Sequence, residues 1–159
     1  MLKPAIMRRI CFPACLSPVL LALAVPCLSL PAPAEDWPQW RGPNRDGRSG
    51  ESDLLRKWPA DGPPLAWKAR TAGGGFSSIA VSKGIIYTLG DLTEGCHVLA
   101  LKEADGSVVW KTRTGESGGH RGYPGPRSTP TVDGGQVFAL DQHSNLVCLN
   151  ASDGEKVWS

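Results

Sequence analysis

The chain has 159 residues, of which 41% are hydrophobic and 20% charged, and its formal net charge is +2 at pH 7. This length suits one globular domain, and the small net charge argues against a nucleic-acid surface built on many phosphate contacts. The sequence lacks G-x-x-x-x-G-K and H-E-x-x-H motifs; no catalytic residue is assigned and no metal site is predicted.

Residues 1–34 have the pattern of a secretory signal peptide. A positive start precedes an apolar stretch at residues 16–30, and Ala32-Pro33-Ala34 supplies small residues before a cleavage site. Cleavage before Glu35 would remove three cations and no acid, so the formal net charge would fall from +2 to −1. We expect export to the periplasm or cell envelope with no membrane span after cleavage; a retained anchor is the alternative. The three cations are Lys3, Arg8 and Arg9.

Residues 35–64 are predicted to form an amino-terminal clasp, because they are rich in Trp, Pro and Gly. The stretch Asp36-Trp-Pro-Gln-Trp-Arg-Gly-Pro-Asn-Arg-Asp-Gly47 holds too many turn-forming residues for a long helix. Its two tryptophans, three residues apart, could pin an extended segment across a preformed surface. The alternative is that the stretch lies near a ligand, with Arg41 and Arg45 as polar contacts. Glu51 to Lys57 is expected to form one or two helical turns.

Two segments repeat each other at an offset of 48 residues: 98–111 (VLALKEADGSVVWK) and 146–159 (LVCLNASDGEKVWS). Each reads as an apolar run, a loop ending in Asp-Gly, and a β-branched run closing on Trp, which predicts a hairpin. A repeat of this length with several strands is typical of propeller blades. Two unrelated hairpins that share Asp-Gly are the alternative.

The predicted fold is therefore all-β, a partial propeller over residues 65–159 made of four-stranded antiparallel blades at about 75–112 and 125–159. Leu65 to Arg70 resembles the Trp-bearing last strand of a repeat but lacks partners, so it is predicted to be an orphan outer strand. Asp91 to Gly95 is predicted to be a longer loop. The expected strands are 76–81, 85–89, 97–101 and 108–111 in the first blade, and 128–132, 136–140, 146–149 and 156–158 in the second.

The segment between the blades, Thr114 to Arg127, is too long and too glycine-rich for a simple connection, and such loops often carry function. His120, Arg121 and Arg127, with Tyr123, offer a titratable ring and two permanent cations. These groups suit an anionic or carbonyl-bearing ligand. The alternative is a solvated loop stiffened by its two prolines.

Two cysteines, Cys96 and Cys148, remain after the predicted cleavage. The repeat places Cys148 opposite Ala100 rather than Cys96, so the two lie at different heights of their blades. We predict two small buried residues rather than a disulfide.

The repeats resemble the pyrroloquinoline-quinone-like β-propeller family, which is shared by quinoprotein alcohol dehydrogenases and BamB. The family repeat, approximately A-L-D-x-x-T-G-x-x-x-W, is met here at its Gly and Trp in both copies, while Lys102 and Asn150 replace the usual Asp. The resemblance implies that each tryptophan packs against the neighbouring blade. That docking role is assigned to Gly106, Trp110, Gly154 and Trp158. The stretches 37–47 and 125–131 are similar to those of exported propellers of planctomycete-like bacteria.

The resemblance implies two functions of different classes. One is a binding or scaffold module in the cell envelope. The other is part of an alcohol or sugar dehydrogenase that uses pyrroloquinoline quinone with calcium, for which His120, Arg121 and Arg127 would be cofactor contacts. The enzyme's calcium ligands and catalytic aspartate cannot be placed in this sequence.

Two blades cannot close a propeller of about eight. The chain is therefore expected to be an amino-terminal fragment of a longer protein, whose partners are its missing carboxy-terminal blades, or to self-associate. An envelope protein is a further expected partner, and nucleic acid is not.

Overall fold

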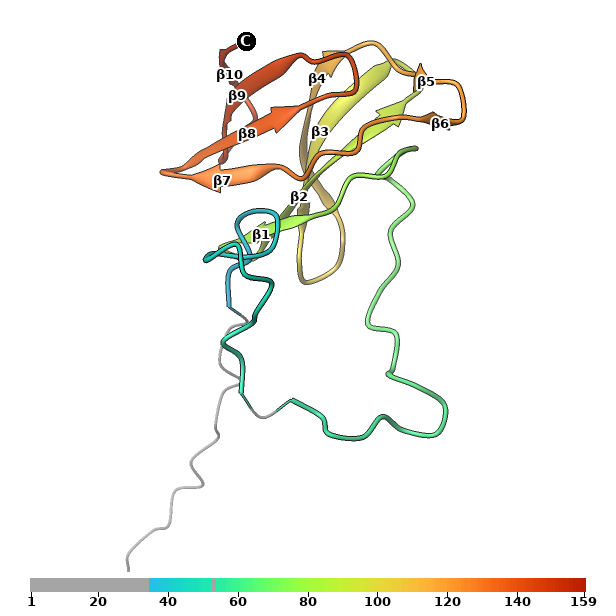
Figure 1. Cartoon of the computed structure of the whole chain (residues 1–159), viewed down its shortest axis with the longest axis vertical. Coiled ribbons are helices and arrows are strands. Elements are labelled where there is room, and N and C mark those ends of the chain that lie inside the picture. The colour runs from blue at the N-terminus through green and yellow to red at the C-terminus, as the bar shows by residue number, and fades with distance from the viewer. Residues whose placement is uncertain (1–34, 53) are drawn as a thin grey trace, which may run out of the picture. The chain divides into compact units, whose positions relative to one another are not determined.

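A computed structural model describes residues 35–52 and 54–159, and the predicted signal peptide lies outside these residues. The described residues are all-β, as predicted, and form two four-stranded antiparallel sheets and one small hairpin (Figure 1). Blade 1 has the order β1-β2-β3-β4, blade 2 has the order β7-β8-β9-β10, and β5 pairs with β6 between them. The strands are β1 Ala80–Ser82, β2 Ile85–Leu92, β3 Gly95–Lys102, β4 Val108–Gly115, β5 Gly119–His120, β6 Tyr123–Pro124, β7 Thr131–Asp133, β8 Gln136–Leu140, β9 Leu146–Asn150 and β10 Lys156–Trp158. Among these residues, no helix is long and apolar enough to cross a membrane.

Several element boundaries differ from the prediction. The expected loop at 91–95 is wrong, because β2 runs to Leu92 and β3 begins at Gly95, which leaves a two-residue turn. The inner strands of the two blades, β1 and β7, are shorter than the expected strands 76–81 and 128–132. The residues before them bond to each other instead, because Phe76 N–H donates to Pro126 C=O (2.7 Å). Glu51 to Lys57 forms no helix in its described residues. Leu65 to Arg70 is not a strand, because no neighbouring strand pairs with it in the described chain.

The main core lies between the two blades, which pack face to face. Alternate residues of β3, including Val98 and Ala100, face blade 2, as the two-residue period of a strand requires. Blade 2 contributes Val137, Ala139, Val147 and Leu149 to this core. The other face of β3 carries Leu99 and Leu101 into a second cluster, against which Trp67 packs.

The far face of blade 2 is open in the described chain. It exposes Leu140 (43%), Leu146 (49%), Val157 (47%) and Trp158 (45%). Since a four-stranded blade buries its faces only against neighbours, this face has the composition of an interface without a partner.

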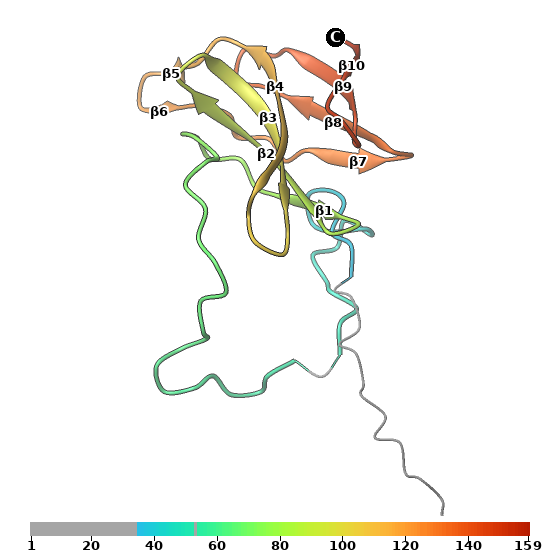
Figure 2. The same ribbon diagram turned by 180° about the vertical axis from the view of Figure 1, so that it is seen from behind.

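The amino-terminal segment contacts the free inner edges of both blades (Figures 1 and 2). Trp37 pairs with Val81 through two backbone hydrogen bonds (2.8 and 2.9 Å), and Pro38 C=O accepts Val132 N–H (2.8 Å). The Asp36 carboxylate accepts the Ser82 hydroxyl and the Lys83 N–H, both at 2.8 Å. Residues 36–38 therefore join β1 to β7.

Candidate functional site

Trp110, on β4, docks blade 1 onto blade 2. Its side chain is 8% exposed, its indole N–H donates to the Ala151 carbonyl (3.0 Å), and its ring lies 5.9 Å from that of Tyr87. Gly154 lies against the ring, because a Cβ added there would be 2.5 Å from it. The Thr112 hydroxyl donates to the Gly154 carbonyl (2.7 Å) and adds a second link. The structure thus brings the repeat's Trp and Gly into direct contact across the blades.

The same contact recurs on the outer face of blade 1. The Trp67 indole N–H donates to the Glu103 carbonyl (2.8 Å), and a Cβ on Gly106 would be 2.7 Å from the Trp67 ring. Glu103 and Gly106 precede Ala151 and Gly154 by 48 residues, so the two docking sites are equivalent positions of the repeat. Trp158 instead is 45% exposed, and its ring lies 6.1 Å from that of Phe138 on its own blade.

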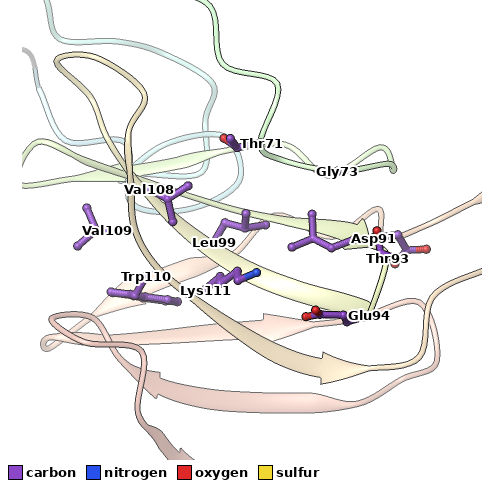
Figure 3. Close-up of a pocket in the computed structure, with 11 residues that line it drawn as sticks. Thr71, Gly73, Asp91, Thr93, Glu94, Leu99, Val108, Val109, Trp110 and Lys111 are labelled. Atoms are coloured by element: carbon purple, nitrogen blue, oxygen red, sulfur yellow. The ribbon is translucent and has the colours of Figure 1, made fainter.

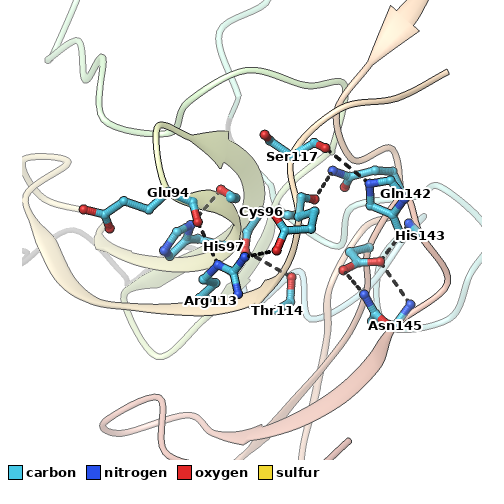
Figure 4. Close-up of polar contacts among 12 residues, drawn as sticks. Glu94, Cys96, His97, Arg113, Thr114, Ser117, Gln142, His143 and Asn145 are labelled. Atoms are coloured by element: carbon cyan, nitrogen blue, oxygen red, sulfur yellow. Dashed lines mark hydrogen bonds and ion pairs between the residues drawn. The ribbon is translucent and has the colours of Figure 1, made fainter. Parts of the chain in front are cut away.

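The interblade segment is anchored to both blades at its base (Figure 4). Asp91, near the end of β2, accepts Gly118 N–H (2.7 Å) and the Gln142 side-chain amide (2.9 Å). The same Gln142 amide donates to the Glu116 carbonyl (3.0 Å), and His143 Nε2 lies 3.3 Å from the Ser117 carbonyl. These contacts join the β2–β3 end of blade 1 to the β8–β9 turn of blade 2, so the base of the segment is held in one position.

Above this base, three aromatic rings form a row. The Tyr123 ring stacks on His120 (centroids 6.1 Å apart) and meets the edge of Phe76 (6.0 Å). Phe76 and Tyr123 are 59% and 61% exposed. The row is held by the hydrogen bond from Phe76 N–H to Pro126 C=O and by that from Gly125 N–H to Gly118 C=O (2.6 Å).

The predicted ligand contacts are only partly brought together. Arg127 donates to the Tyr123 carbonyl, which places its guanidinium beside the row, and His120 belongs to the row itself. Arg121 lies in the exposed β5–β6 turn, and no hydrogen bond or ion pair within the described chain joins it to the others. We call Phe76, His120, Tyr123 and Arg127 the interblade surface. Sequence reasoning missed Phe76, because no short-range pattern links it to a loop 47 residues away.

Among the described residues, a cleft on blade 1 and another between the blades lie elsewhere, and none of His120, Arg121 and Arg127 lines either of them. One, of about 770 Å³, runs along the outer face of blade 1, with Leu99 at its floor and Glu94 and Lys111 among its polar groups (Figure 3). The other, of about 730 Å³, lies between the blades below the clasp and is lined by Asp36, Tyr87 and Asp133 among others. Neither cleft combines cations with a row of rings.

The described residues do not fit a quinone held by calcium. Within 35–52 and 54–159, no group of three or more His, Cys, Asp or Glu side chains is placed to hold a metal ion. The cations beside the row are exposed, and Arg127 already donates to a backbone carbonyl.

Cys96 and Cys148 are both free and fully buried, which confirms the prediction that they do not pair. Burial raises the pKa of the Cys96 thiol to about 11, from an ordinary value of 9.0. Because folding raises this pKa, the neutral thiol stabilises the fold fully below about pH 9, and the contribution is lost as pH rises through 11.

We expect the free energy of unfolding to fall by about 2 kcal/mol between pH 9 and pH 11 in the wild-type chain through Cys96 alone. The variant Cys96→Ala removes the titrating group, so its unfolding free energy should decline less over this range. Urea titrations at half-unit pH intervals measure both slopes. Identical slopes in the two proteins would show that Cys96 does not couple folding to pH.

Comparison with known families finds a match of residues 51–159 to the profile described as outer membrane protein assembly factor BamB. A comparison with curated proteins finds no match.

Proposed function

The chain belongs to the family of outer membrane protein assembly factor BamB, as its repeats predicted, and from this premise we propose that it is a binding or scaffold module of the cell envelope. The family is one of β-propellers, whose blades supply a rigid support for binding loops. The proposal includes export to the periplasm or envelope through the signal peptide predicted at residues 1–34.

The observation that carries the proposal is the interblade surface. It exposes Tyr123, on a segment that is tied to both blades, and Phe76, whose N–H donates to the Pro126 carbonyl of that segment, so the positions of both rings are set before a partner binds. Tyrosine and arginine supply much of the binding energy at protein interfaces, and preorganisation lowers the entropic cost of association. The partner that fits is a protein segment with apolar side chains for the rings and a carboxylate for Arg127.

A second part of the proposal concerns the open blade faces. Trp67 and Trp110 make the same contact with successive blades, whereas Trp158 has its docking side exposed. This internal repetition supports the proposal that a further blade of the same repeat packs on the open face of blade 2. That blade would carry a Gly at the position that corresponds to Gly106 and Gly154. Such a blade could come from a longer form of this chain, and the fragment interpretation stays a prediction. Self-association is the other way to cover the face.

Photo-crosslinking tests the interblade surface. A photoactivatable phenylalanine analogue replaces Tyr123 in one full-length protein and Trp58 in another, since both positions are 61% exposed. We expect a discrete protein adduct from position 123 in the native host and not from position 58. The captured protein is then purified, and its affinity is measured for the wild type, Tyr123→Ala, Arg127→Gln and the matched control Trp58→Ala.

The two substitutions in the interblade surface should each weaken binding by about 30-fold, as for hot-spot residues, while Trp58→Ala stays within about twofold. The same adducts from both positions, or affinities that Tyr123→Ala and Arg127→Gln leave unchanged, would show that the partner binds elsewhere.

The alternative function is part of a quinone-dependent alcohol or sugar dehydrogenase, with His120, Arg121 and Arg127 as cofactor contacts. No specific feature of the described residues favours it, because they supply no acidic cluster for the calcium. Calorimetric titration of the full chain with pyrroloquinoline quinone and calcium decides between the two. Saturable binding that Arg127→Gln abolishes would replace the scaffold proposal.

A further inference from the structure

The clasp carries a short loop, Gln39 to Gly47, whose exposed side chains take no part in joining the blades. Its backbone is closed by Gly42 N–H to Gln39 C=O (3.0 Å), Arg45 N–H to Gly42 C=O (3.1 Å) and Gly47 N–H to Arg41 C=O (2.9 Å). We call this segment the Trp40 loop. It follows directly on Trp37 and Pro38, which bind the free edges of β1 and β7, so its position on the blades is fixed.

Trp37 and Trp40 make different contacts. The Trp37 ring packs on Gly42, where an added Cβ would lie 2.8 Å from it, and the residue is half-buried. Trp40 is 63% exposed, and the structure gives it one ring contact, with the Arg41 guanidinium 5.4 Å from its centroid. Since an exposed indole contributes little to the packing of the fold, Trp40 is available for a ligand.

The guanidinium groups of the loop are held in place and keep donors free. Arg41 Nη2 donates to the Asp46 carbonyl (3.2 Å), and Arg45 Nε donates to the Gln39 side-chain oxygen (2.9 Å). Each group thereby uses one nitrogen on the loop and leaves others to face solvent. Gln39 is fixed in turn by its own amide, which donates to the Pro43 carbonyl (3.1 Å).

No carboxylate pairs with these cations in the part of the chain that the structure describes. The ion pair found there joins Arg113 to Glu116, on blade 1 and the interblade segment. Asp46 is nearest in sequence, but its carboxylate accepts Arg48 N–H and only its carbonyl meets Arg41. Each of these guanidinium groups, without an ion pair, keeps donors that suit an oxyanion.

Arg41 and Arg45 share a strained backbone conformation. Arg41 and Arg45 have φ values of 63° and 58°, a left-handed conformation that costs a non-glycine residue about 1 kcal/mol. Glycine or asparagine would occupy both positions with less strain. Lys83 and Ser144 have the same conformation in the β1–β2 and β8–β9 turns (φ 51° and 69°), so the case for a ligand rests on the exposed Trp40 ring and the guanidinium groups without an ion pair.

We propose that the Trp40 loop binds an acidic polysaccharide, with Trp40 against the C–H face of a sugar ring and Arg41 and Arg45 on its carboxylate. An indole face attracts polarised C–H groups, and a guanidinium binds a carboxylate through two parallel hydrogen bonds. A neutral glycan leaves the cations unused, and a nucleic acid requires a wider basic surface than two arginines on a chain of formal charge +2 provide. The site is separate from the interblade surface and goes beyond the proposed function.

The test is titration of the full chain with polygalacturonate, with neutral dextran, dextran sulfate and single-stranded oligothymidylate as comparison ligands. We expect saturable binding of polygalacturonate that Trp40→Ala and Arg45→Gln each weaken at least about tenfold. The matched controls are Trp58→Ala and Arg56→Gln, which remove the same side-chain types from exposed positions outside the loop, and Tyr123→Ala, which alters only the interblade surface. All three should bind polygalacturonate as the wild type does.

The variants Trp40→Ala and Arg45→Gln alter exposed side chains and should fold as the wild type does. Their melting temperatures are compared with that of the wild type, so that a loss of binding can be distinguished from a loss of folding. Dextran sulfate that also binds through Trp40 and Arg45 would extend the ligand to sulfated sugars and support the site. Absence of polygalacturonate binding, equal weakening by the controls, or tighter binding of oligothymidylate than of polygalacturonate would overturn the proposal.

Discussion

Replacing Trp110 with alanine is expected to lower the free energy of unfolding by about 3–5 kcal/mol, the range for truncation of a buried aromatic residue. The substitution removes the indole N–H bond to the Ala151 carbonyl and the contacts with Tyr87 and Gly154, and it leaves a cavity between the blades. Urea unfolding followed by circular dichroism measures the change.

Trp158→Ala is the matched control, because it removes the same residue type from the equivalent position of the second repeat. Trp158 is 45% exposed and contacts Phe138 on its own blade, so we expect a loss of about 1 kcal/mol or less in the chain of 159 residues. Equal losses from Trp110→Ala and Trp158→Ala would mean that docking across the blades does not stabilise the fold.

Gly154→Ala is expected to cost about 3 kcal/mol or more, through two effects that can be separated. Its φ of 75° is unfavourable for any residue with a Cβ, and that Cβ would lie 2.5 Å from the Trp110 ring. The ring is held by the Ala151 carbonyl and by Tyr87, so it cannot move away freely. The change is measured by the same urea titration.

Gly84→Ala isolates the backbone effect. Gly84 has a φ of 74°, and nothing lies within 4 Å of an added Cβ, so this variant should lose only about 1–2 kcal/mol. The remainder of the Gly154→Ala loss is the clash with the Trp110 ring and with the Thr112 hydroxyl, 2.7 Å from the added Cβ. The double variant Gly154→Ala with Trp110→Ala should therefore lose less than the sum of the single variants. Additive losses, or equal losses at Gly84 and Gly154, would contradict a close Trp110–Gly154 contact.

The sequence predicts best what the repeat determines locally. In blade 2 the expected strands 136–140 and 156–158 agree with β8 and β10, because Gly134-Gly135 and Asp153-Gly154 mark the turns and β-branched or aromatic residues fill the strands. The turn at Thr93-Glu94 replaces the predicted loop at 91–95, because a glycine such as Gly95 also favours a loop in sequence. In the structure Gly95 is the first residue of β3, where a Cβ would lie 2.4 Å from the Gly115 carbonyl. Glycine at this position lets β3 and β4 approach each other closely, and it does not mark a flexible connection.

The candidate site shows where prediction from sequence ends. The residue types of the interblade segment predict His120, Arg121 and Arg127 as ligand contacts, but the aromatic row depends on the contact between Phe76 and Tyr123, which only the tertiary arrangement produces. The sequence indicates only that Leu65 to Arg70 resembles the Trp-bearing last strand of a repeat, whereas the contact of Trp67 with Gly106 requires the outer face of blade 1 to be formed. Long-range packing of this kind leaves no signal at short sequence separation.

The two equivalent docking contacts connect the fold to the proposed function. Trp110 fixes blade 2 against blade 1, and the interblade surface is supported by groups from both blades, including Asp91 and Gln142. A change that loosens the docking should therefore also disorder the row of rings above it.

The contact between each tryptophan and its glycine is measured most directly by the nuclear magnetic resonance spectrum of the full chain. If the blades dock as described, ring currents shift the Hα protons of Gly154 and Gly106 upfield of those of Gly84 and Gly135, and nuclear Overhauser effects join Gly154 to Trp110 and Gly106 to Trp67. Hα resonances of Gly154 and Gly106 at ordinary positions, with no Overhauser effect to either indole, would contradict the repeated docking on which this account rests.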